Sequence, residues 1–128
     1  MARILVVDDS STYRINMREI LESVGHTIVG EAVNGVEAVE KYKELNPDIT
    51  TMDISMPIKR GLDALKEIIE FDPDAKVIMI SAAAQQKTIS EAFIHGAYDF
   101  FPKPLVPKQI IHVLDNINSF SDEMTEKE

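Results

Sequence analysis

Three acidic residues and one lysine stand just after short apolar runs of the chain: Asp8, Asp9, Asp53 and Lys103. If these runs are parallel strands of one sheet, the three carboxylates and the ammonium meet at the same edge. At about 5 Å and an effective dielectric constant near 20, two carboxylates repel each other by about 3 kcal/mol. A divalent cation offsets such repulsion. The residues therefore predict a metal-assisted phosphoryl site.

The rest of the chain predicts the elements that bring these residues together. Short apolar runs alternate five times with segments of helical periodicity. The runs 4–7 and 77–80 are apolar without interruption, which is typical of strands buried on both faces. The other expected strands are 27–32, 48–52 and 98–101. Five strand–helix units predict an α/β fold with a doubly wound parallel sheet, whose functional residues lie at the carboxyl ends of the strands.

Residues that begin and end helices support this division. Gly25 follows the first apolar stripe as a C-terminal cap, and Gly96 ends the fourth helical segment. Asn34 and Glu37 have the spacing of a capping box, and Pro107 suits the first turn of the last helix. The first stripe consists of Tyr13, Met17, Ile20, Leu21 and Val24, and the fourth of Ile89, Ala92 and Phe93.

The composition limits the class of protein. The chain has 128 residues, a formal net charge of −9 and no cysteine. The charge argues against wide contacts with nucleic acid or an anionic membrane, and the lack of cysteine excludes disulfides and thiolate metal sites. Because the sequence has no long apolar stretch and no signal-peptide pattern, we expect a cytoplasmic protein. We expect one domain over residues 1–118, and a short acidic tail over 119–128 with no output domain.

Taken together and in order, the motifs of the chain resemble those of response-regulator receiver domains over residues 3–118. Each motif alone is weak, but the full set at this spacing is specific. The resemblance implies a flavodoxin-like, five-stranded parallel sheet of strand order 2-1-3-4-5 with helices on both faces. The motifs are Val6-Val7-Asp8-Asp9-Ser10, Met52-Asp53 with Met56-Pro57 and Gly61, Ile80-Ser81-Ala82, Gly96-Ala97 and Lys103-Pro104.

The resemblance also implies a chemical role for the acidic residues. Asp53 is expected to accept a phosphoryl group from the phosphohistidine of a sensor histidine kinase, which gives an aspartyl phosphate. Asp9 and Asp53 are expected to bind Mg²⁺ directly, Asp8 mainly through water, and Ser55 through its backbone carbonyl. Oxygen ligands of this kind suit Mg²⁺, which also bridges to substrate phosphate.

The same resemblance assigns the remaining site residues. Lys103 is expected to pair with a phosphoryl oxygen and to precede a cis bond to Pro104. Ser81 is expected to donate its hydroxyl to the phosphoryl group, and Phe100 to swing inward on activation. The output surface is then the face of the predicted fourth helix, fifth strand and fifth helix, which would dock on a protein target.

Several residues depart from the family pattern. Lys59 and Arg60 form a basic pair beside an acidic pocket, either as a solvated loop or as a feature that steers an acidic partner. The resemblance places Ser55 and Ala83 beside the phosphoryl site. Ala82, Ala83 and Ala84 leave that side open, so we expect a modest to short phosphoryl lifetime. Pro102 lacks a backbone donor, which an edge strand tolerates.

The three histidines, His26, His95 and His112, show no metal-ligand spacing with one another. We expect surface or half-buried positions for them and assign them no role.

Three alternatives remain. A dehalogenase-type enzyme with an aspartate nucleophile needs an Asp-x-Asp motif after the first strand, whereas Asp8 and Asp9 are adjacent. A flavodoxin-like cofactor binder needs a Ser-, Thr- and Gly-rich loop after the first strand, but Asp8 and Asp9 stand there and would repel a cofactor phosphate. A receiver-fold scaffold would bind partners without phosphorylation.

The expected function is that of a stand-alone response regulator in chemotaxis or motility. The alternative within the same family is an intermediate that passes a phosphoryl group along a phosphorelay. We expect a monomer, with a weak dimer after phosphorylation. Catalysis would be limited to its own phosphorylation and dephosphorylation, so whether the protein counts as an enzyme is a matter of definition.

Overall fold

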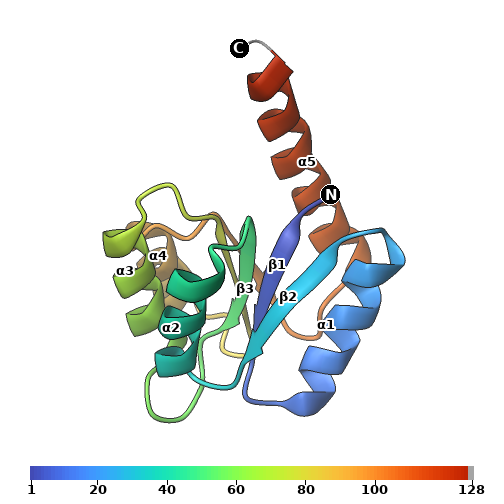
Figure 1. Cartoon of the computed structure of the whole chain (residues 1–128). Coiled ribbons are helices and arrows are strands. Elements are labelled where there is room, and N and C mark those ends of the chain that lie inside the picture. Colours follow the sequence, from blue (N-terminus) through green and yellow to red (C-terminus); the bar gives the residue numbers. More distant parts are fainter. Residues whose placement is uncertain (127–128) are drawn as a thin grey trace.

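The chain forms a five-stranded, entirely parallel sheet in the order β2-β1-β3-β4-β5 (Figure 1). The computed structural model describes the backbone of residues 1–126 and the side chains of residues 1–117. The strands are β1 (Arg3–Val7), β2 (Thr27–Ala32), β3 (Ile49–Asp53), β4 (Val77–Ser81) and β5 (Asp99–Pro102). The helices are α1 (Ser11–Ser23), α2 (Gly35–Leu45), α3 (Gly61–Phe71), α4 (Gln86–Ile94) and α5 (Pro107–Glu126). The predicted fold class and strand order are confirmed.

The helices cover both faces of the sheet, as expected. In Figure 1, α2, α3 and α4 lie on one side and α1 and α5 on the other. Leu5 and Val7 of β1 belong to the apolar cluster under α2, α3 and α4, whereas Ile4 and Val6 belong to the cluster under α1 and α5. Because successive side chains of a strand point to opposite faces, burial on both sides requires an unbroken apolar run.

The helix caps follow the sequence signals with small differences. Asn34 Oδ1 accepts a hydrogen bond from Glu37 N at 2.9 Å, while Glu37 Oε1 accepts from Val33 N rather than from Asn34 N. Gly25 and Gly96 take positive φ angles of 95° and 101° directly after the C-caps of α1 and α4. The helix α5 begins at Pro107 and continues to Glu126, so it enters the segment expected to be a tail.

The strand β5 forms one edge of the sheet, which explains why it accommodates Pro102. Lys103 N donates toward the sheet, to Ser81 O at 3.0 Å. Because successive backbone N–H groups of a strand point to alternate sides, the nitrogens of Phe100 and Pro102 face the free edge. Proline has no N–H, and Phe100 N donates to Asp99 Oδ1 at 2.8 Å.

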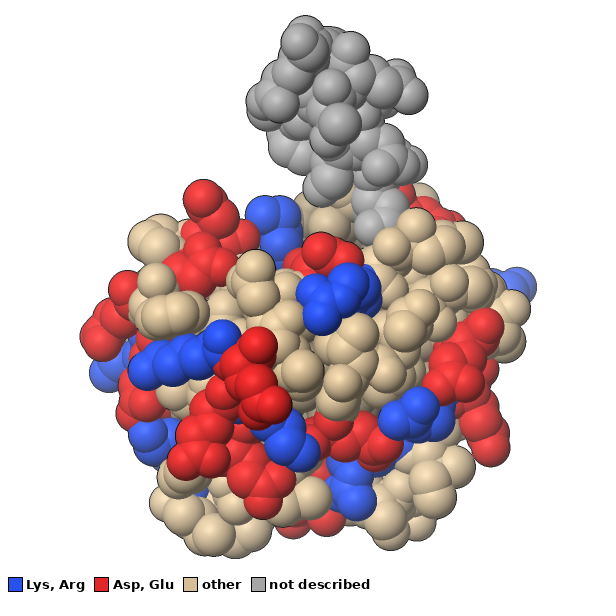
Figure 2. Space-filling view, viewed as in Figure 1, with Lys and Arg blue, Asp and Glu red and all other residues tan. Residues whose placement is uncertain are grey.

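The surface agrees with the acidic composition. On the face in Figure 2, acidic and basic side chains of the described residues are interspersed, and no wide basic area is visible among them. None of the helices described here has the length and apolar character needed to span a membrane.

Phe93 and His26 differ from the sequence-based expectation. Phe93 was assigned to the apolar stripe of α4, but it is 47% exposed, and Ala92 is the fully buried residue of that helix. His26 was expected at a surface or half-buried position, but it is buried. Its Nδ1 accepts a hydrogen bond from Ala2 N at 3.1 Å, and its Nε2 has no partner among the described residues.

We predict that His26 makes the protein less stable in mild acid. Burial lowers the pKa of His26, although the charge of Asp115 opposes this effect. The unfolded chain therefore binds the proton more tightly, and stability falls as the pH drops below the ordinary histidine pKa of about 6.5. Urea unfolding should show a loss of about 1 kcal/mol between pH 7 and pH 5 that His26→Asn reduces. In that variant Oδ1 can replace Nδ1 as the acceptor.

The matched control is His112→Asn, which changes an exposed histidine of α5. If the free energy of unfolding depends on pH in the same way in His26→Asn and in the unmodified chain, His26 is not the cause of the loss of stability in acid.

Candidate phosphoryl-acceptor site

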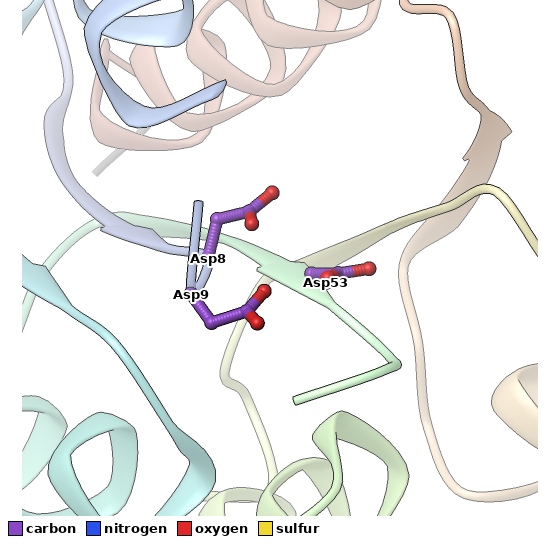
Figure 3. A group of neighbouring side chains, drawn as sticks. All are labelled: Asp8, Asp9 and Asp53. Carbon is purple, nitrogen blue, oxygen red and sulfur yellow. The ribbon is translucent and has the colours of Figure 1, made fainter. Parts of the chain in front are cut away.

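Three carboxylates converge at the carboxyl end of the sheet, where β1 and β3 lie side by side. Asp8 and Asp9 follow β1 and Asp53 ends β3, and each offers an oxygen within 4.8 Å of the others (Figure 3). Asp8 and Asp53 are 7% and 6% exposed, whereas Asp9 is exposed. The chain connections leave β1 toward β2 on one side and β3 toward β4 on the other, so the cluster lies at the switch point of the fold.

Lys103 brings a positive charge to this cluster from the loop after β5. Its Nζ lies 2.9 Å from Asp8 Oδ2 and 3.6 Å from Asp53 Oδ2, and its side chain is 9% exposed. The bond between Lys103 and Pro104 is cis, as predicted. The structure thus brings together the four residues from which the sequence predicted the site.

The surroundings of Asp53 raise the pKa of its carboxyl group above the ordinary aspartate value. Burial raises the pKa of Asp53, the charge of Asp8 raises it further, and Lys103 only partly opposes these effects. Burial alone would lower the pKa of Lys103, but the hydrogen bond to Asp8 and the charge of Asp53 outweigh it and raise that pKa. The cluster therefore holds more negative charge than one lysine offsets.

The backbone around Asp8 is fixed from several directions. Asp8 Oδ1 accepts a hydrogen bond from Ser10 N at 2.9 Å, and Asp8 N donates to Ala32 O at 3.0 Å. Arg14 Nη1 donates to Asp8 O at 2.8 Å, and Arg14 Nε also contacts Glu31 Oε1 at 3.1 Å. The loop that carries the acidic pair is thus held to α1 and to β2.

The loop after Asp53 depends on a glycine. Gly61 N donates to Ile54 O at 2.8 Å, and a Cβ at position 61 would lie 2.0 Å from Asp53 O. Only glycine permits this approach, so it fixes the backbone next to Asp53. Ile58, in the same loop, is exposed and has a φ angle of 71°.

The two expected switch residues end up buried on neighbouring strands. Ser81 ends β4 and its Oγ accepts a hydrogen bond from Ala83 N at 3.0 Å. Phe100 of β5 is 8% exposed and packs in the cluster under α2, α3 and α4. Ala83 and Ser55 are both exposed.

The residue that the sequence reasoning missed is Tyr13. It was assigned to the apolar stripe of α1, but it is 37% exposed, and its ring centroid lies 3.8 Å from Lys103 Nζ. The spacing from Tyr13 to Met17 is that of a buried helical stripe, so it predicts burial. The one signal in the sequence that could have placed Tyr13 at the site is its position about one helical turn after Asp8 and Asp9.

With this geometry established, comparison with known proteins identifies the class. Residues 4–115 match the family model of the response regulator receiver domain. The chain belongs to this family.

Individual relatives cover most of the chain. It is 48% identical to the chemotaxis protein CheY of Thermotoga maritima, over 91% of this chain and 97% of that protein. It is 46% identical to protein CcdB of Bacillus subtilis, over 91% of this chain and 98% of that protein. The crystal structure of the CheX–CheY–BeF₃–Mg²⁺ complex from Borrelia burgdorferi contains a similar chain, with a TM-score of 0.86 and 38% identity over 90% of this chain and 87% of that one.

We predict that Asp53→Asn stabilises the protein in metal-free buffer at neutral pH. Because the pKa of Asp53 is raised in the folded state, ionisation of this group costs stability as the pH rises above the unfolded-state value. Removing the charge should raise the free energy of unfolding by about 1–2 kcal/mol, the scale of a like-charge pair partly offset by Lys103.

Urea unfolding measures this difference, with Asp74→Asn as a matched exposed control expected to change within about 0.5 kcal/mol. Added Mg²⁺ should stabilise the unmodified chain more than Asp53→Asn. A less stable Asp53→Asn protein would show that Lys103 more than offsets the repulsion.

Proposed function

We propose that this chain is a response regulator switched by Mg²⁺-dependent phosphorylation of Asp53. The observation that carries the proposal is a buried Asp53 that shares a 4.8 Å cluster with Asp8 and Asp9 and lies 3.6 Å from Lys103. The groups that the reaction needs therefore lie close together. Asp53 would be the nucleophile, Asp8 and Asp9 would hold the metal, and Lys103 would contact the incoming phosphoryl group.

The donor set fits Mg²⁺. Three carboxylates supply hard oxygen ligands, and the exposure of Asp9 leaves room for the water molecules that Mg²⁺ retains. Asp9 and Asp53 would bind the ion directly, with Asp8 acting through water and Ser55 through its carbonyl. When bound, the ion neutralises charge on the carboxylates and on the phosphoryl oxygens.

In the proposed reaction, a carboxylate oxygen of Asp53 attacks the phosphorus of a phosphohistidine in the donor kinase. The new O–P bond forms as the P–N bond breaks, and the imidazole leaves with the electron pair and takes up a proton. Lys103 contacts Asp8 more closely than Asp53 before the reaction. Its ammonium would then turn to a phosphoryl oxygen, a charge-assisted contact.

The signal would pass from Asp53 to the surface through Ser81 and Phe100. The Ser81 hydroxyl would exchange its contact with Ala83 N for one with the phosphoryl group and draw the loop after β4 inward. Phosphorylation would thereby favour one of two conformations.

The face of α4, β5 and α5 would change with this conformation and dock on a protein target. Phe93 and Ile94 on α4 are 47% and 77% exposed and would supply apolar contacts there.

We place the protein in chemotaxis because of its similarity to the CheY of Thermotoga maritima and to the CheY chain of the Borrelia complex. The Borrelia CheY is in complex with CheX, so a CheX-like protein is one candidate target of this chain.

The test is the intact mass after incubation with acetyl phosphate and Mg²⁺. We expect a gain of about 80 Da, one phosphoryl group, in the unmodified chain. Asp53→Asn and EDTA should each abolish the gain, because the first removes the nucleophile and the second the metal. No adduct and no binding of beryllofluoride, with Mg²⁺ binding confirmed, would favour a scaffold that works without phosphorylation.

We predict a phosphoryl half-life of minutes rather than hours, because the small exposed Ala83 leaves a path for the attacking water. Ala83→Tyr should lengthen the half-life several-fold by covering this path. The decay is followed by intact mass after removal of acetyl phosphate, and the urea-denatured phosphoprotein gives the rate without the fold. A half-life of many hours in the unmodified protein would contradict the open-site explanation.

A further inference from the structure

The ammonium of Lys103 has a third neighbour besides the two carboxylates. The ring centroid of Tyr13 lies 3.8 Å from Lys103 Nζ, well within cation–π distance. A cavity of about 20 Å³ is lined by the Tyr13 ring, Asp8, Asp53 and Lys103, among others, so all four groups border one space. The Lys103 side chain is only 9% exposed although it follows an edge strand.

The start of α1, which carries Tyr13, is held by the same loop that carries the acidic pair. Ser10 caps α1, and its Oγ accepts a hydrogen bond from Tyr13 N at 3.4 Å. Ser10 N also donates to Asp8 Oδ1 at 2.9 Å. One residue thus couples the Asp8 carboxylate to the first turn of α1, and the backbone of Tyr13 is held near the site.

Lys103 needs such a contact because its anionic partners change during the proposed reaction. A lysine side chain is a flexible four-carbon stem that carries a point charge, and carboxylates alone would draw it toward Asp8, its nearer partner. The face of an aromatic ring attracts a cation without carrying a net charge. It therefore retains the ammonium without adding repulsion against an incoming phosphoryl group.

We propose that Tyr13 is a positioning residue that holds the Lys103 ammonium at the phosphoryl-acceptor site while Lys103 exchanges Asp8 for a phosphoryl oxygen. This role rests on the proposed function, phosphorylation of Asp53. The active feature is the face of the ring, so phenylalanine should substitute for tyrosine, whereas leucine should cover the ammonium without attracting it.

The first measurement is the rate of phosphorylation by acetyl phosphate at saturating Mg²⁺, followed by intact mass. We expect Tyr13→Phe to react within about twofold of the unmodified chain and Tyr13→Leu to react about three- to tenfold more slowly, the range that a cation–π contact supplies. Tyr98→Leu is the matched control. Tyr98 is 43% exposed and precedes β5, so it lies at the opposite end of the strands from the site.

The second measurement detects the contact itself. Protons held over the face of an aromatic ring are shielded, so the Lys103 side-chain NMR signals, assigned with Lys103→Arg, should be shifted upfield in the unmodified chain and in Tyr13→Phe. Tyr13→Leu should lose the shift. With Mg²⁺ and beryllofluoride bound, the shift should persist, because the ring retains the ammonium in the activated state.

The outcomes separate this role from the function on which it rests. An unmodified chain that takes up no phosphoryl group overturns the proposed function, and this role with it. If that chain reacts but Tyr13→Leu matches its rate, only the positioning role is overturned. Equal slowing of Tyr13→Phe and Tyr13→Leu, or loss of the shift when beryllofluoride binds, also overturns it.

Discussion

The repulsion among Asp8, Asp9 and Asp53 is the constraint on which the rest of the structure depends. Two of these carboxylates are buried, and one lysine offsets only part of their charge. A cluster of this kind is stable only if the surrounding backbone holds it. Hydrogen bonds from Ser10 and Arg14 hold the loop after β1, and the close approach of Gly61 holds the loop after β3. The repulsion lowers stability at one edge of the sheet, and the same cluster forms the proposed site for a divalent cation and a phosphoryl group.

The parallel sheet makes this arrangement possible. Its apolar strands are buried on both faces, so they place the ends of β1, β3, β4 and β5 at a common edge with little freedom. Residues far apart in the sequence, such as Asp8 and Lys103, then lie within 2.9 Å of each other. The proposed switch uses the same order of strands, because β4, which ends at Ser81, lies between β3 with Asp53 and β5 with Phe100.

Much of the fold and the charged core of the site could be predicted from the sequence, because both depend on local patterns. Apolar runs, caps and turn residues mark the elements, and the resemblance supplied the strand order. Side-chain partners across the fold could not be predicted in the same way. Tyr13 and Met17 have the spacing of one apolar stripe, yet only Met17 is buried. The burial of His26 and the exposure of Phe93 likewise depend on which neighbours cover them, which helical periodicity alone does not specify.

The free edge of β5 has a consequence for recognition. Its two outward-facing backbone nitrogens offer nothing to a partner, since Pro102 has no N–H and Phe100 N already donates to Asp99. An additional strand, whether from a target or from another copy of the chain, would find no donors there to extend the sheet. A protein that binds this side therefore cannot form a complete backbone ladder and would have to recognise side chains as well, and a side-chain surface can change when the conformation of the protein changes. The same chemistry protects the edge against the strand pairing that begins aggregation.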